Sequence, residues 1–96
     1  MRFEWDPEKD RANQRKHGLG FTEIEKLFRS GADYLEIFDE QHSTLEERFI
    51  AIGPIERGVI VVAWTELAGG TVRIISGRFA DKAEQELYRS FMEGTL

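Results

Sequence analysis

The chain of 96 residues contains no cysteine, so neither a disulfide framework nor a thiolate metal site can form. Histidine is scarce as well: His17 and His42 are the two present, and neither an HxxxH nor an HExxH spacing occurs. Acidic residues gather between positions 39 and 47, but without DxD-type spacing, which favours a solvated loop over a magnesium site. We therefore expect no metal and no cofactor.

Long apolar runs are also missing. The longest runs from Val59 to Trp64, far short of the roughly 20 apolar residues that span a bilayer, and it predicts a buried strand. The opening residues, MRFEWDPEKD, contain no apolar segment of the kind found in signal peptides. We expect a cytoplasmic protein with no membrane partner.

Positive charge is in deficit, because the net charge is −5 at pH 7. This disfavours a general nucleic-acid binder, whose affinity depends on neutralising phosphates. The charge is unevenly distributed, however: residues 22–47 hold eight acids and two bases, whereas residues 9–17 hold four bases and one acid. A basic patch can therefore form on an acidic protein, with the acidic segment turned away from any RNA or toward a basic partner.

Three helices are expected, and each has a favoured N-cap residue at its start. Asp6, followed by Pro7, begins the first, which ends before Gly18. Thr22 begins the second, with Glu25 completing a capping box, and it ends at Ser30-Gly31. Asp81 begins the third, with Glu84 at its third position.

Five strands are expected from alternating or continuous apolar patterns. They cover residues 2–5, 34–38, 48–53, 58–66 and 71–79. The connections at Gly53-Pro54 and Gly69-Gly70 are short, which favours antiparallel hairpins. The predicted fold is one α+β domain over residues 1–96, in the order β-α-α-β-β-β-β-α, with helices packed on an antiparallel sheet.

The first helix is polar on all sides, with Ala12 as its single aliphatic residue. Lys9, Asn13 and Lys16 share one face by their spacing. This face either belongs to a solvated helix or contacts phosphate or a partner. His17 follows at the helix end, where it either transfers protons or caps the last carbonyls.

Three arginines on expected strands suit phosphate binding, because guanidinium makes bidentate charge-assisted hydrogen bonds. They are Arg48, Arg73 and Arg78. Arg73 and Arg78 are five residues apart, so in a regular strand they point to opposite faces, unless Gly77 marks a bulge. We favour Arg78, at the strand end, for a site. An ion pair with Glu47 or Glu66 is the alternative for Arg73.

Four blocks in order along the chain resemble the BrnT family of toxins. They are FEWDPEKDRANQRKHGLGF (3–21), EERFIAIG (46–53), WTE (64–66) and RIISGRFADKAEQELY (73–88). The resemblance implies a RelE-like fold and a metal-independent RNA endonuclease, in which the ribose 2′-hydroxyl attacks the adjacent phosphate. It also implies neutralisation by a BrnA-like ribbon-helix-helix antitoxin, with DNA bound only through the toxin–antitoxin complex.

The resemblance carries over eight candidate residues by position. They are Lys9, Lys16, His17, Arg48, Glu66, Arg73, Arg78 and Tyr88. Arg48 and Arg78 would hold the phosphate, and either His17 or Glu66 would serve as base. The remaining basic residues would bind RNA, and Tyr88 is equally expected to be a core residue.

Three positions depart from the family pattern by losing polarity near the expected site: Trp64, Leu67 and Phe79. They motivate a second hypothesis, a catalytically weak or inactive module that binds an antitoxin and modulates operon repression. A third, a DNA-binding regulator, is disfavoured by the net charge and by the lack of helix-turn-helix spacing.

Overall fold

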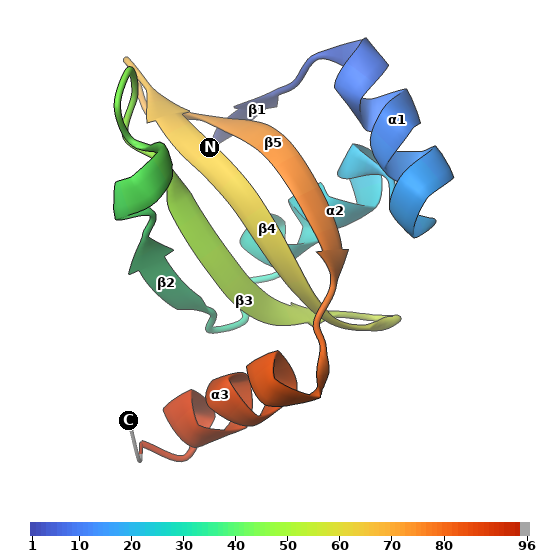
Figure 1. Ribbon diagram of the computed structural model, residues 1–96, viewed down its shortest axis with the longest axis vertical. Helices are drawn as coiled ribbons and strands as arrows, with labels where there is room; N and C mark the ends of the chain where they lie inside the picture. The colour runs from blue at the N-terminus through green and yellow to red at the C-terminus, as the bar shows by residue number, and fades with distance from the viewer. Residues whose placement is uncertain (95–96) are drawn as a thin grey trace.

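The computed structural model describes residues 1–94 and shows an α+β fold, as predicted. One five-stranded sheet has helices on both of its faces (Figure 1). The elements are β1 (Arg2–Glu4), α1 (Pro7–His17), α2 (Phe21–Arg29), β2 (Leu35–Phe38), the 3-10 turn η1 (Glu40–His42), β3 (Phe49–Ile55), β4 (Gly58–Leu67), β5 (Thr71–Phe79) and α3 (Lys82–Met92).

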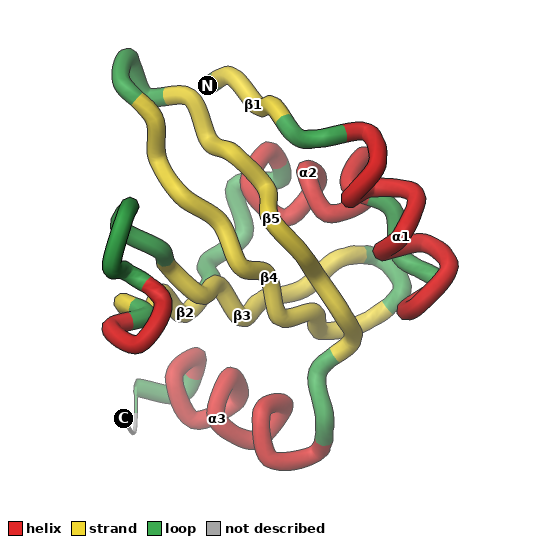
Figure 2. Tube along the Cα trace, turned by 45° about the horizontal axis from the view of Figure 1, so that its top comes forward, coloured by secondary structure: helices red, strands yellow, loops and turns green. Residues whose placement is uncertain are grey.

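The sheet has the strand order β1-β5-β4-β3-β2. Strands β2 to β5 form the antiparallel meander expected from the short connections. Strand β1 joins its edge in parallel with β5, a pairing that the sequence did not indicate. Figure 2 shows α1 alongside the β5 side of the sheet, whereas the acidic segment around β2 and η1 lies at the opposite edge.

The two faces of the sheet are packed unequally. The main core lies on the face covered by α2, where Ile24 and Leu27 are fully buried against the sheet and Trp64 joins them. On the other face a smaller cluster gathers around Ile52 and Val61, with side chains of α3 against it. Much of this second face is not covered by a helix, and we call it the open face.

Two of the three predicted helix starts are confirmed, with Asp6 and the Asp81–Glu84 capping box in place. The capping box at Thr22 is wrong, because the N-cap of α2 is Gly20, two residues earlier. The Phe21 N–H donates instead to the Asp10 carboxylate of α1, at 2.9 Å. None of the helices within residues 1–94 is long and apolar enough to cross a membrane.

The turn predicted at Gly53-Pro54 is also wrong, because β3 continues to Ile55. Gly53 is instead a site of close packing between sheet and helix. A Cβ at this position would come within 2.7 Å of the side chains of Leu27 and Tyr34. The glycine that suggested a turn is therefore required by the approach of α2 to the sheet.

Candidate active-site groove

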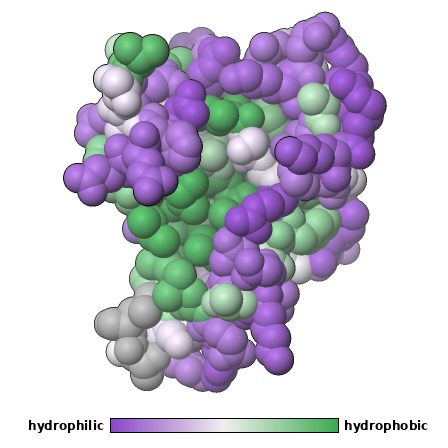
Figure 3. Space-filling view, in the orientation of Figure 1, coloured by the Kyte–Doolittle hydropathy of each residue, from purple (hydrophilic) through white to green (hydrophobic). Residues whose placement is uncertain are grey.

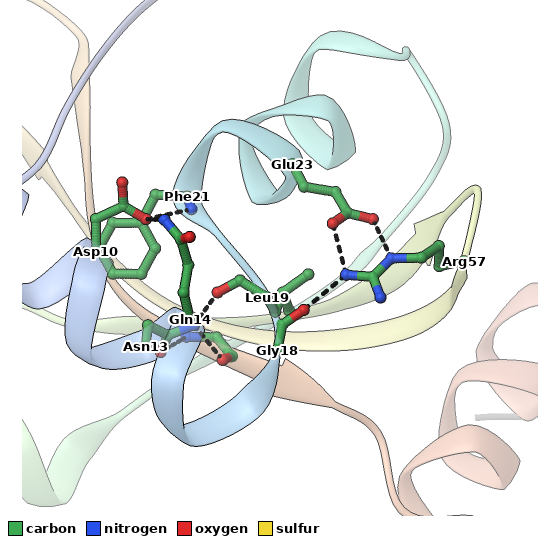
Figure 4. A network of polar contacts seen from close by, with 9 residues as sticks. Asp10, Asn13, Gln14, Gly18, Leu19, Phe21, Glu23 and Arg57 are labelled. Carbon is green, nitrogen blue, oxygen red and sulfur yellow. Dashed lines mark hydrogen bonds and ion pairs between the residues drawn. The ribbon is translucent and has the colours of Figure 1, made fainter.

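A buried asparagine attaches the polar helix α1 to the sheet. Asn13 donates from Nδ2 to the carbonyl oxygens of Leu19, at 2.7 Å, and Gly77, at 2.8 Å (Figure 4). Its Oδ1 accepts from the Gly77 N–H at 3.1 Å. Asn13 lines the same pocket as Lys9 and Lys16, as their spacing predicted, but it is 6% exposed and serves as an anchor rather than as a contact for phosphate or a partner.

A second set of contacts fixes the corner where α1 ends. Arg57, from the β3–β4 hairpin, donates twice to the Glu23 carboxylate and once to the Gly18 carbonyl, at 2.7–2.8 Å (Figure 4). The hydrogen bond from Arg57 lowers the pKa of Glu23. Gly18 has φ 66°, the left-handed conformation expected for a residue that ends a helix. The last turn of α1, with Lys16 and His17, is therefore held in place.

Two adjoining pockets of about 350 and 210 Å³ lie where α1 meets β5, and Lys16, His17 and Ser76 line both. The larger one extends over the open face to Val61 of β4 and Ile50 of β3. Together they form what we call the α1–β5 groove. Arg78 lines the larger pocket and Lys9 the smaller. Four candidate residues from two separate parts of the sequence, α1 and β5, thus line one groove: Lys9, Lys16, His17 and Arg78.

An irregularity in β5 decides which arginines share a face. Ser76 pairs with Ala63 and Ile74 with Trp64, so Ile75 has no partner on β4. This extra residue shifts the alternation of side chains. Arg73 and Arg78, which a regular strand would place on opposite faces, both belong to the open face. The bulge exception therefore applies, at Ile75 rather than at Gly77.

Arg78 is bound by a residue that sequence reasoning considered only as a helix cap. Its Nη1 and Nη2 each donate to a carboxylate oxygen of Glu84, at 2.7 Å, and Nη1 lies 3.4 Å from the Phe79 carbonyl. The hydrogen bond from Arg78 lowers the pKa of Glu84 to about 2. Only the preference for Glu at the third helical position indicated Glu84 in the sequence.

Arg73 and Arg48 lie outside the groove. Arg73 forms an ion pair with Glu4 of the neighbouring β1, at 2.6 Å, rather than with Glu47 or Glu66. Arg48 precedes β3 and lines a different pocket, formed with residues 41–46.

Glu66 and Tyr88 are not in the groove either. Glu66 pairs with the core residue Val72, so it lies on the α2 face, roughly 16 Å along β4 from Val61 at the usual strand rise. Tyr88 donates to the Asp33 carbonyl at 3.0 Å and packs α3 on the sheet. Within residues 1–94, no three histidine or acidic side chains gather as metal ligands would.

The three departures from the family pattern do not face the groove. Trp64 packs with Phe28 and Phe49 in the main core. Phe79 lies beneath the Arg57 guanidinium, 5.1 Å from it to the ring centroid. Leu67 ends β4 and lines neither pocket. These three residues therefore remove no polarity from the α1–β5 groove.

Known proteins resemble this chain in sequence and in structure. The family model described as "Ribonuclease toxin, BrnT, of type II toxin-antitoxin system" matches residues 5–84. The 1.1 Å crystal structure of the Brucella abortus ribonuclease toxin BrnT is similar, with a TM-score of 0.62 and 27% identity. The similarity covers 85% of this chain and 99% of that one. A comparison with curated proteins finds no match.

Proposed function

Because the chain belongs to the BrnT family of ribonuclease toxins of type II toxin–antitoxin systems, we propose that it is an endoribonuclease that cuts RNA in the α1–β5 groove. The observation that carries the proposal is the gathering of Lys9, Lys16, His17 and Arg78 in one groove of an acidic protein. An RNA chain lying there would meet cations on both sides, from α1 and from β5. RNA is present in the cytoplasm, and the protein would act in that compartment.

The proposed reaction is attack by the ribose 2′-hydroxyl on the adjacent phosphate. The hydroxyl loses its proton to a base as the new O–P bond forms, and the bond to the 5′ oxygen of the next nucleotide breaks as that oxygen gains a proton. The products are a 2′,3′-cyclic phosphate and a free 5′-hydroxyl. The reaction requires a base, an acid and cationic groups that stabilise the negatively charged oxygens of the pentavalent phosphorane, and we propose that side chains supply all three without a metal.

The groove offers residues for the base and for the positive charge. His17 is suited to proton transfer near neutral pH, and it lines both pockets. Arg78 would hold the phosphate through its guanidinium, and Lys16 would add a second positive charge from α1. We prefer His17 to Glu66 as the base, because Glu66 lies on the α2 face of the sheet.

Residues outside the groove would bind RNA away from the cut phosphate. Arg73 lies on the same face as Arg78, and roughly 13 Å separates their partners Thr65 and Val61 along β4, which places it near another nucleotide. Arg73 would have to exchange its contact with Glu4 for one with phosphate. Lys9 would extend the path along α1. Arg48, at the far side of the sheet, is the least supported of the predicted site residues.

The family implies an antitoxin, and we propose a BrnA-like ribbon-helix-helix protein that binds DNA on behalf of the complex. The open face offers a surface for it. Figure 3 shows hydrophobic surface gathered over the sheet, with hydrophilic surface on either side. Ile37 and Ile50 pair on this face, and Ile37 is 40% exposed. Contiguous exposed apolar surface of this kind is typical of protein interfaces. The RelE-like label for the fold remains part of the proposal.

The test is induction of the protein alone in a bacterial host. We expect growth arrest and RNA cleavage, both abolished in Arg78→Ala and His17→Ala while the circular dichroism spectrum stays native. Arg89→Ala and His42→Ala are matched controls, because Arg89 is exposed on α3 and His42 is an exposed residue at the end of η1. Intact RNA at high doses of the wild-type protein would contradict the endoribonuclease proposal and leave antitoxin binding as the remaining function. The second hypothesis, an inactive antitoxin-binding module, was motivated by Trp64 and Phe79, and both lie outside the groove.

A further inference from the structure

We propose that Glu84 is a positioning residue for Arg78. Its carboxylate binds Nη1 and Nη2 of the guanidinium and leaves the Nε–Nη2 edge available to an RNA phosphate in the groove. The inference rests on the proposed function, because Arg78 is the arginine assigned to the phosphate. It adds α3, which contributes no side chain to the groove, to the elements on which the reaction depends.

The contact between the two side chains is a planar, two-bonded pair. Nη1 and Nη2 of Arg78 each donate to one oxygen of Glu84 at the same distance, 2.7 Å. Such a pair fixes the plane and direction of the guanidinium, which a single hydrogen bond does not. The Arg78 side chain is 43% exposed, and it lies near the end of a strand, where an unbound arginine would sample many rotamers.

Glu84 is itself held in place from two directions. Its Oε1 also accepts from the Asp81 N–H at 2.9 Å, and its own N–H donates to Asp81 Oδ1 at 2.8 Å. These contacts form the capping box that begins α3. The Glu84 side chain is 22% exposed. The position of Arg78 is therefore tied to the helix backbone rather than to a mobile surface carboxylate.

The Arg78 guanidinium keeps N–H donors that Glu84 does not use and that a phosphate could accept from. Arginine has five N–H donors, and the pair with Glu84 uses one on each terminal nitrogen. Within the part of the chain that the structure describes, Nε of Arg78 has no hydrogen-bond partner. The Nε–Nη2 edge can thus bind two phosphate oxygens while Glu84 stays bound.

This arrangement predicts an effect on catalysis rather than on affinity. Glu84 carries a negative charge beside an RNA site, so removing it does not weaken the attraction of the groove for RNA. The substitution instead removes the fixed direction of the guanidinium, and small misplacements of this kind reduce the chemical step. The competing explanation is that Glu84 only caps α3. Asp81→Ala offers a control, because it removes the side-chain half of the capping box but keeps the Asp81 N–H that binds Glu84 Oε1 and both hydrogen bonds from Arg78 to Glu84.

The first experiment measures cleavage of a short single-stranded RNA by purified variants. We expect Glu84→Gln to lower kcat by about 10- to 100-fold with KM unchanged or reduced, whereas Asp81→Ala retains the wild-type kcat. Full activity of Glu84→Gln, or an equal loss in Asp81→Ala, would overturn the inference.

The second experiment does not depend on cleavage. The Nε–H resonance of Arg78, followed by 15N relaxation, should report an ordered side chain in the wild-type protein and in Asp81→Ala, and a mobile one in Glu84→Gln. Equal order in all three proteins would overturn the inference. A wild-type protein that leaves RNA intact would contradict the proposed function instead, so the two failures are distinguishable.

Discussion

At the scale of single residues, the ion pair between Arg78 and Glu84 has a consequence for stability as well as for the site. The hydrogen bond from Arg78 lowers the pKa of Glu84 from 4.5 to about 2. A carboxylate whose pKa is lower in the folded than in the unfolded state stabilises the fold above the unfolded value. That stabilisation is lost as the pH falls through the folded value.

We therefore expect wild-type protein to lose more stability than Glu84→Gln as the pH falls from 4.5 to about 2. The difference should be about 1–2 kcal/mol, allowing for solvent screening of the half-exposed arginine. Urea unfolding at the two ends of this range measures it. Glu86→Gln, which removes an exposed carboxylate from the same helix, is the control. Parallel losses in wild type and Glu84→Gln would show that the pair does not stabilise the fold.

The sequence indicated some residues of the groove and missed the contacts that place them. Lys9, Lys16 and His17 could be found because helical spacing relates neighbours along the chain. The role of Asn13 could not be predicted, because one of its hydrogen-bond partners is the backbone of Gly77, 64 positions away. Arg73 was considered with two acidic partners, but its ion pair is with Glu4, on a strand pairing that no local pattern reveals.

At the scale of elements, α1 is attached to the sheet by polar contacts rather than by an apolar face. Strand β1 pairs only with Thr71–Arg73 of β5, so farther along that edge β5 has no strand neighbour. There the Asn13 amide supplies both a donor and an acceptor to Gly77, as a neighbouring strand would. This explains how a helix that is polar on all sides holds a defined position.

Replacing Asn13 with alanine should therefore destabilise the protein by about 2–4 kcal/mol, because it leaves the Leu19 and Gly77 carbonyls and the Gly77 N–H buried without partners. Chemical denaturation measures the change. Gln14→Ala is the matched control, since its amide forms a single exposed bond with Asp10 and its removal should cost far less. Equal effects of the two substitutions would argue against the anchoring role.

The close packing of α2 on β5 predicts that a larger residue at Gly77 lowers the stability of the fold. A Cβ at Gly77 would collide with Cδ1 of Ile24. We expect Gly77→Ala to cost about 1–3 kcal/mol through overpacking. Ile24→Val removes the colliding methyl group, so Gly77→Ala should be less costly in that background, and the double-mutant cycle measures the coupling. Strictly additive effects would contradict the close approach.

The errors at this scale have a common physical origin. Thr22 and Pro54 carry local signals for a cap and a turn, but Asp10 accepts a hydrogen bond from the start of α2, and β3 pairs with β4 as far as Ile55. The bulge at Ile75 likewise depends on pairing with β4. Local preference predicts an element when no distant group competes, as at Asp6 and Asp81.

At the scale of the whole molecule, the distribution of charge separates two sides of an acidic protein. The six acids of residues 33–47 lie around β2 and η1 at one edge of the sheet, and the basic helix α1 lies along the other. RNA that approaches the protein is therefore directed to the side that holds the groove. The net charge alone suggested a poor nucleic-acid binder, and the location of the charges is what supports RNA binding.

The salt dependence of RNA binding tests this distribution. Removing one cation that neutralises a phosphate should reduce the slope of log K against log salt by about 0.7 for a single strand. We expect this change for Lys16→Gln, which lines the groove, and no change for Lys26→Gln on α2. Fluorescence anisotropy with a short labelled RNA over a range of salt concentrations gives the slopes. Equal slopes for the two variants would place the RNA elsewhere.

The most direct test of the central claim is the identity of the RNA ends made by the purified protein. We predict 2′,3′-cyclic phosphate and 5′-hydroxyl ends, formed in the presence of a chelator and absent in both His17→Ala and Arg78→Ala, with His42→Ala and Arg89→Ala active. Ends carrying a 5′-phosphate, or full cleavage by the two groove variants, would contradict RNA cutting by the side chains of the α1–β5 groove.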